Sequence, residues 1–222
     1  MANAIEKVNA IAIADIEKIN GKTDDNIEKL NTLEFTGVTD AHTFIDNDLA
    51  SKGDGSHASL GFTSGIDSTY DVYEFHFINI HPETNGVEFG FQVSTGSGFD
   101  QLNITSSVFR TYHSEDGTSN NLGYRSGTDL SNQSIYQKLT EYTGNQGDGS
   151  VSGILTLFAP SSGTYVKHFM ATVNDMYDAT SQSTFYVSGY INTTTAIDEI
   201  DFKFSADEIQ GGEIRMYGLA KS

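Results

Sequence analysis

The sequence predicts a mainly β protein: an antiparallel two-sheet β-sandwich of the jelly-roll type, preceded by a short helical repeat arm. Apolar and polar residues alternate with a period of two from about residue 72 onward, and 22 Gly with only 2 Pro indicate many tight turns. A short phrase also repeats near the N-terminus. The 222 residues are enough for one core of this size and an appendage. We therefore expect an arm at residues 1–37 and a β-sandwich domain at residues 38–222.

The arm contains three near-copies of one phrase with a period of eleven residues. The copies read IEKVNA, IEKING and IEKLNT. The first and fourth positions of each copy are apolar, a spacing that lines one side of a helix. These positions are occupied by Ile5, Val8, Ile16, Ile19, Ile27 and Leu30. An eleven-residue period is also typical of a right-handed coiled coil. Asn20-Gly21 favours a helix end, so we predict separate short helices rather than one long helix.

Helices of one or two turns are unstable alone, because each copy buries too little apolar surface to offset the entropy of ordering it. Repeated units of this kind need a neighbouring surface. We therefore expect the six apolar residues to dock onto another subunit or another protein. The alternative is that the arm folds back over its own sandwich and covers an edge of a sheet.

Eight strands are predicted from the alternation. In the first two, at 72–80 and 87–93, one face is entirely apolar, and its residues are Tyr73, Phe75, Phe77, Val87, Phe89, Phe91 and Val93. We expect these two strands to be antiparallel neighbours joined by the sequence HPETNG. The other six are predicted at about 103–112, 151–159, 164–173, 184–192, 196–204 and 213–218.

Two of these segments differ in their polarity. The sequence GILTLFA, at 153–159, is apolar on both faces and predicts a central strand that is covered on both sides. The strand at 196–204 directs Ile200, Phe202 and Phe204 inward and has polar residues opposite. The long polar segment between the third and fourth predicted strands ends in SNQSIYQKL, which favours one or two helical turns.

Composition restricts the classes of partner. The formal net charge of −18 repels phosphate backbones and anionic lipid head groups, so we predict neither nucleic acid nor membrane as a partner. The sequence contains no Cys, which removes disulfides, thiolate metal sites and a Cys nucleophile. The N-terminal residues have no basic region followed by an unbroken apolar stretch, so no signal peptide is predicted.

A search for catalytic motifs predicts that the protein is not an enzyme and uses no cofactor or metal. The six His match no metal-binding spacing, and neither a Gly-x-Ser-x-Gly elbow nor a phosphate-binding Gly-rich loop occurs. Carboxylates that would suit glycan cleavage as pairs lie in the predicted strands and face outward by alternation, at Glu74, Glu88, Glu199 and Asp201. A loop with oxygen ligands of the type that calcium prefers contains Asp46, Asp48 and Asp54. We interpret both sets as surface residues.

The three repeats and the C-terminal sequence FKFSADEIQGGEIRMYGLAKS resemble virion structural proteins of tailed bacteriophages, notably of marine cyanophages. The resemblance covers the first 37 residues and roughly the last 20. It implies a non-enzymatic virion component that is assembled in the host cytoplasm, such as a tail fibre, a tail-associated protein or a capsid decoration protein. It also implies a homotrimer that binds other virion proteins.

The alternative function is a carbohydrate-binding module that recognises host-surface polysaccharide through the loops at 113–134 and 145–150. Four tyrosines belong to a residue type that stacks on sugars, namely Tyr112, Tyr165, Tyr186 and Tyr190. Tyrosines on sheets mainly pack across strands, so the sequence by itself does not favour this alternative.

Overall fold

The computed structural model describes residues 41–51, 57–96, 98–99, 101–177 and 180–219, together with twelve residues of the N-terminal arm. The chain divides into two compact units, Met1–Ala41 and His42–Ser222. The sequence-based boundary was expected at residue 37, and the second unit begins with the first long strand.

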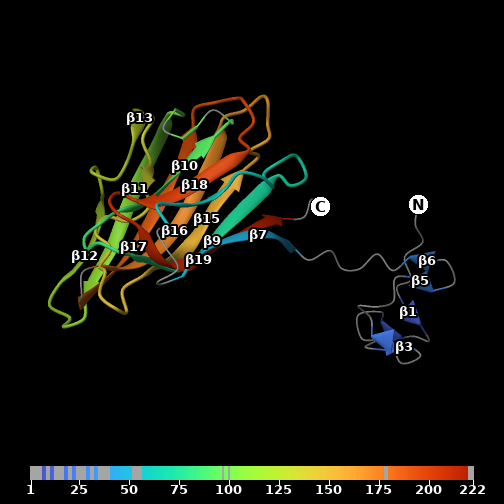
Figure 1. Ribbon diagram of the computed structural model, residues 1–222, viewed down its shortest axis with the longest axis horizontal. Coiled ribbons are helices and arrows are strands. Elements are labelled where there is room, and N and C mark those ends of the chain that lie inside the picture. Colours follow the sequence, from blue (N-terminus) through green and yellow to red (C-terminus); the bar gives the residue numbers. More distant parts are fainter. Residues whose placement is uncertain are drawn as a thin grey trace. The chain divides into compact units, whose positions relative to one another are not determined.

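Two antiparallel sheets form the second unit (Figure 1). The larger sheet has the order β12-β11-β17-β16-β15-β9-β19-β7, and β13 also pairs with β11. Its strands are β7 (His42–Ala50), β9 (Val72–Pro82), β11 (Ile104–Ser114), β12 (Asn120–Tyr124), β13 (Ser131–Gln133), β15 (Val151–Phe158), β16 (Lys167–Tyr177), β17 (Ser181–Ile191) and β19 (Ile209–Leu219). The smaller sheet has the order β14-β10-β18-β8, formed by β8 (Leu60–Phe62), β10 (Phe89–Ser94), β14 (Gln137–Lys138) and β18 (Glu199–Phe204). The prediction of a mainly β, two-sheet sandwich is confirmed.

Aromatic rings from the two sheets meet in the core. Phe202 on β18 is fully buried, and its ring centroid lies 5.6 Å from that of Phe75 and 5.2 Å from that of Phe77, both on β9. Phe89 and Phe91 on β10 complete this cluster beside Phe202. The inward faces that alternation predicted for these strands are therefore confirmed, and the sheets are held together mainly by apolar burial.

The predicted pairing of the first two strands is wrong. β9 pairs with β15 and β19, whereas β10 pairs with β14 and β18 in the other sheet. The aromatic faces of the two strands meet across the core instead, with the rings of Phe77 and Phe89 5.2 Å apart. The HPETNG segment therefore connects the two sheets rather than closing a hairpin.

The helical turns expected in SNQSIYQKL are also absent, because this segment contributes β13 and β14. Three further strands, β7, β8 and β12, had no sequence prediction. β7 and β12 form the edges of the larger sheet, where one side of the strand has no neighbour and polar residues are frequent, so the alternation is weak.

The described residues of the arm differ from the predicted helices. They form three antiparallel strand pairs: β1 (Lys7–Val8) with β2 (Ile11–Ala12), β3 (Lys18–Ile19) with β4 (Lys22–Thr23), and β5 (Lys29–Leu30) with β6 (Leu33–Glu34). Two residues separate the paired strands in each copy, and the first of them is always Asn. In the second copy these two residues are Asn20-Gly21, which is a strong signal for a two-residue hairpin turn and favours strands where helices were expected.

Among the described residues, no helix has the length and the apolar character that crossing a bilayer requires.

Candidate functional site

The most distinctive surface is the outer face of the larger sheet, which we define as the face whose side chains point away from the smaller sheet. Strand register places one row of residues across six neighbouring strands of this face. The row consists of Tyr124, Phe109, Tyr186, Thr172, Ile154 and His76, on β12, β11, β17, β16, β15 and β9. Directly paired residues share a face of a sheet, so the row is continuous.

Large apolar side chains on the outer face are exposed to solvent. Phe109 is 46% exposed, Ile154 is 40% exposed and Met170 on β16 is 58% exposed, whereas their inward-facing neighbours are buried. The expectation that the segment containing Ile154 is covered on both sides is therefore wrong. β15 is central in its hydrogen-bonded sheet, but only its inner face is packed against the second sheet.

The rings of Phe109 and Tyr186 form a stacked pair on this face. Their centroids lie 4.8 Å apart and their planes are inclined by 13°. A groove of about 680 Å³ begins at this pair and runs over the central strands. Its lining residues include Phe109, Tyr186, Met170, Ile154, Thr172 and Asn174. Short hydroxyl and amide side chains thus lie among exposed apolar ones in the groove.

Glu74 is the charged residue of the groove lining, and it is engaged by two histidines. Its Oε2 atom lies 2.9 Å from Nε2 of His76 and 3.1 Å from Nε2 of His42. The ring of Tyr217 packs against His76 with a centroid distance of 4.8 Å. These contacts connect β7, β9 and β19 on the outer face.

The four carboxylates considered for glycan cleavage are not brought together. Glu74 lies in the larger sheet, whereas Glu199 and Asp201 lie on β18 in the smaller one. Glu88 precedes β10 and accepts a bond from Nζ of Lys138 at 2.9 Å. Asp201 accepts a hydrogen bond from the Tyr136 hydroxyl at 2.7 Å. The described geometry therefore does not form a two-carboxylate cleft from these residues.

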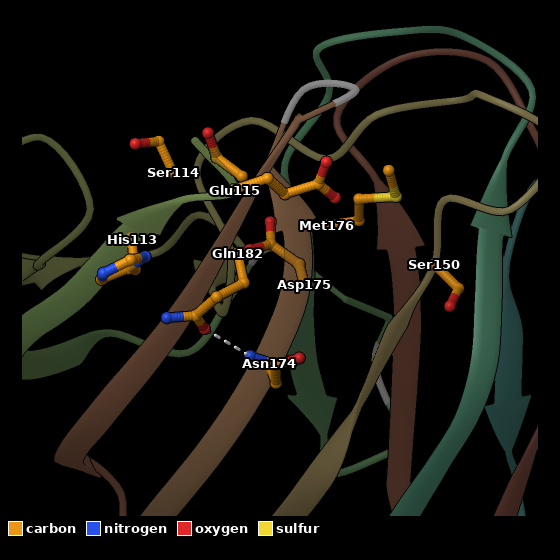
Figure 2. Close-up of a pocket in the computed structure, with 9 residues that line it drawn as sticks. His113, Ser114, Glu115, Ser150, Asn174, Asp175, Met176 and Gln182 are labelled. Atoms are coloured by element: carbon orange, nitrogen blue, oxygen red, sulfur yellow. Dashed lines mark hydrogen bonds between the residues drawn. The ribbon is translucent and has the colours of Figure 1, made fainter. Parts of the chain in front are cut away.

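A second, smaller pocket lies where β11 and β16 end and β17 begins, and its volume is about 330 Å³ (Figure 2). Figure 2 shows Glu115, Asp175 and Gln182 around this pocket, with the amide of Asn174 bonded to Gln182. Asp175 is the most buried of them, with 1% of its surface exposed. Its Oδ2 accepts a hydrogen bond from Thr143 at 3.3 Å, and its Oδ1 has no partner among the described residues. Burial raises the pKa of Asp175 to about 7.

A buried Arg lies near Asp175 on the neighbouring part of the inner face. The guanidinium of Arg110 donates to Glu141 at 2.8 Å, and Glu141 also binds Arg125. The guanidinium carbon of Arg110 lies 5.2 Å from the ring centroid of Tyr112 and 5.0 Å from that of Tyr177. Glu141 neutralises the charge of Arg110, and the two tyrosine rings separate the guanidinium from solvent. Because Glu141 belongs to the 139–144 segment and Arg110 to β11, we assign this cluster a role in joining the segment to the sheet.

The residues predicted for docking are only partly described. Val8, Ile19 and Leu30 occupy the same place in strands β1, β3 and β5, while Ile5, Ile16 and Ile27 lie outside the described residues. Asp54 of the suggested calcium loop also lies outside them. Asp48, in β7, accepts a bond from the backbone N–H of Gly61 at 2.8 Å. Within the described ranges, no three His, Asp or Glu residues are grouped so that they would hold a metal ion.

The tyrosines considered for sugar stacking separate into different environments. Tyr186 lies in the outer face groove, whereas Tyr165 is 73% exposed in the 159–166 segment outside it. Tyr112 lies on β11 and its hydroxyl is 2.8 Å from Oγ of Ser181. The sequence does not identify Phe109, Ile154 and Met170 as binding residues. Ile154 and Met170 are apolar at positions where alternation demands a polar residue, but in GILTLFA this signal predicts coverage on both sides, and Phe109 carries no separate signal in the sequence.

No family model matches this chain, and neither a curated protein nor a solved structure matches it.

Proposed function

We propose that this chain is a non-enzymatic structural protein of a tailed-phage virion, a fibre, tail-associated or capsid decoration component with a jelly-roll-like sandwich. In this proposal, the arm attaches the protein to other virion proteins and the sandwich is displayed. The protein is a homotrimer that is assembled in the host cytoplasm.

The observation that supports the proposal most directly is the regularity of the arm. Each of the three copies pairs two residues with two others at the same place in the eleven-residue period. A two-stranded hairpin of this length is unstable by itself, since it buries little surface and leaves backbone groups unpaired. Three such units in a row therefore favour attachment to a neighbouring surface, whether they are strands or helices.

The organisation of the rest of the chain is compatible with this function. The unit His42–Ser222 contains its own continuous hydrophobic core, so it does not need the arm for its interior. It is rich in long antiparallel strands. The formal net charge of −18 makes copies of the protein repel one another, which opposes aggregation at high local concentration, and it disfavours binding to nucleic acid.

Deletion of residues 1–34 tests the docking role. We expect the truncated protein to fold, with an unchanged circular dichroism spectrum in the β region, and to be missing from purified particles. A finer variant replaces Val8, Ile19 and Leu30 with Ser, and a matched control replaces Lys7, Lys18 and Lys29 with Gln. Normal incorporation of the truncated protein would refute docking through the arm.

The copy number in the particle would distinguish between the proposed locations. Quantitative mass spectrometry of purified virions measures it directly. Hundreds of copies would indicate the capsid surface, and a few to tens would indicate the tail or a fibre. Sedimentation equilibrium of the full chain tests the trimer, and a monomer at all concentrations would contradict it.

A further inference from the structure

We propose that the groove on the outer face of the larger sheet binds a neutral oligosaccharide chain. Its sugar rings would pack on the stacked pair Phe109 and Tyr186, and its hydroxyl groups would bond to the short polar side chains of the groove. This site lies on the strands, not in the loops at 113–134 and 145–150 from which the sequence suggested carbohydrate binding. It does not depend on the arm.

The stacked pair provides an ordered apolar surface. Phe109 and Tyr186 are directly opposite in the register of β11 and β17, and both line the groove while 46% and 38% of their surfaces stay exposed. Because their planes are only 13° from parallel at 4.8 Å, each ring restricts the rotation of the other. The pair is therefore ordered before a ligand arrives, which lowers the entropy that binding must remove. A sugar ring has an apolar C–H face and a polar edge. The apolar C–H face can pack against the exposed surface of the Phe109–Tyr186 pair.

The floor of the groove supplies the polar half of the match. Ser152 and Thr156 on β15, Thr172 and Asn174 on β16, and Ser188 on β17 all line it. Hydroxyl groups both donate and accept hydrogen bonds, as do the hydroxyl groups of a sugar. No Lys or Arg is among the lining residues.

The size of the groove favours a chain rather than a single sugar. Its lining residues come from β11, β17, β16, β15 and β9, which are consecutive in the sheet. Four strand spacings of about 4.8 Å give a length of roughly 19 Å across the sheet. A ligand that crosses the strands would meet apolar and polar residues in turn.

Charge selects the neutral class of oligosaccharide. Glu74, the charged residue of the lining, already lies within hydrogen-bond distance of His76 and His42. The chain as a whole has a formal charge of −18, which repels sulfated, phosphorylated and uronic-acid polymers. An acidic ligand would also lack a basic partner in the groove.

A second copy of the chain is the competing occupant, and the floor of the groove disfavours it. Ser is depleted in protein interfaces, and the buried centres of homodimer interfaces are more apolar than the rest of the surface. A flat protein surface would cover Thr156 and Thr172 without providing a bond to each, which is unfavourable, whereas Oγ of Ser188 already lies 3.3 Å from Oγ of Ser107. A polyhydroxylated ligand can satisfy both threonines.

The test measures binding of the full chain to neutral hexaoses built from glucose, mannose, galactose or xylose, with oligogalacturonate as the anionic probe. Isothermal titration calorimetry gives the affinity, and sedimentation velocity on the same samples reports self-association. We expect at least one neutral hexaose to bind and oligogalacturonate not to bind. In the Phe109→Ala/Tyr186→Ala variant, the affinity should fall by about tenfold or more.

Two further variants keep the result interpretable. Thr172→Trp fills the groove from an exposed position between Tyr186 and Ile154, and it should abolish binding without changing the thermal midpoint. Tyr165→Ala removes an exposed ring outside the groove and should bind as the wild type does. The proposal is overturned if no neutral hexaose binds, or if both groove variants keep full affinity. It is also overturned if the groove variants abolish self-association and sugar binding is absent, which would assign the face to a second copy. The sugar-binding test uses the purified chain, whereas the docking test measures incorporation into particles. A failure of sugar binding can therefore be distinguished from a failure of the docking role.

Discussion

Asp175→Asn tests the electrostatics of the inner face, because this substitution removes a titrating group without changing its shape. Asp175 is 1% exposed at the end of β16 and its pKa is raised to about 7. Burial is the main cause, and the nearby Glu141 adds to it, while Thr143 and Arg110 act in the opposite direction. The carboxyl group is therefore held in an environment that favours its neutral form.

The sign and size of the effect follow from proton linkage. The unfolded chain releases the Asp proton near pH 4 and the folded chain releases it near pH 7, so the folded state binds more protons between these values. The stability of the wild type is therefore lowered progressively as the pH rises from about 4 to about 7, and the loss is complete above that range. A difference of about three between the two pKa values corresponds to about 4 kcal/mol.

Urea unfolding of both proteins between pH 4.5 and pH 8.5 provides the measurement. The free energy of unfolding of the Asn variant minus that of the wild type should increase by about 3 kcal/mol over this range, since part of the total effect has already occurred below pH 4.5. Groups that both proteins share cancel in this difference. Asp116→Asn is the control, since Asp116 is exposed and hydrogen bonds from Thr118 and Ser114 lower its pKa to about 2. Its difference from the wild type should stay flat over this range. A flat or falling difference for Asp175→Asn would refute the reasoning.

Three other substitutions test packing and pairing, and urea unfolding measures each of them. Phe202→Ala should lower the free energy of unfolding by about 3–5 kcal/mol, because it empties the centre of the aromatic core. Gly153→Ala should lower the free energy of unfolding by about 1–3 kcal/mol, because the new Cβ would lie 2.4 Å from the Thr172 carbonyl oxygen. Gly163→Ala is the control, since its Cβ would meet no atom within 4 Å, and it should leave the free energy of unfolding unchanged. Glu141→Ala should lower it by about 3 kcal/mol, because Arg110 would stay buried without its carboxylate. An unchanged free energy of unfolding for Phe202→Ala or Gly153→Ala would contradict the packing described for that residue. An increased free energy of unfolding for Glu141→Ala would contradict the role of the Arg110–Glu141 ion pair.

The core could be predicted from the sequence because its signal is local. Alternation depends only on which residues lie two positions apart, and it identified eight strands with inward apolar faces, including the buried rings of Phe75, Phe89 and Phe202. It missed the short β8 with Leu60 and Phe62. Pairing is not local. The strands containing Phe75 and Phe89 are consecutive in the sequence, and a short polar connection is typical both of a hairpin and of a crossing between sheets. The aromatic inner faces alone are compatible with either arrangement.

The arm shows a similar ambiguity at the level of a dipeptide. Asn20-Gly21 suits both a helix end and a two-residue hairpin turn, since each requires a backbone conformation that Asn and Gly adopt easily. The i, i+3 spacing of Ile16 and Ile19 then favoured the helix. The described residues Lys18–Ile19 and Lys22–Thr23 are nevertheless paired strands, and the same pairing occurs in all three copies.

The candidate site required the structure for a different reason. An apolar residue on the outward side of a strand, such as Ile154, has the same sequence signal as a residue that is covered by another layer. Only the number of layers distinguishes the two, and the smaller sheet packs on one face of the larger sheet alone. Phe109 and Tyr186 lie 77 residues apart by their numbers, and only the register of β11 with β17 makes them a stacked pair. Exposed apolar residues that gather on one face of a protein mark a candidate binding surface. This argument explains why the outer face, and not one of the polar loops, is the surface on which binding experiments should concentrate.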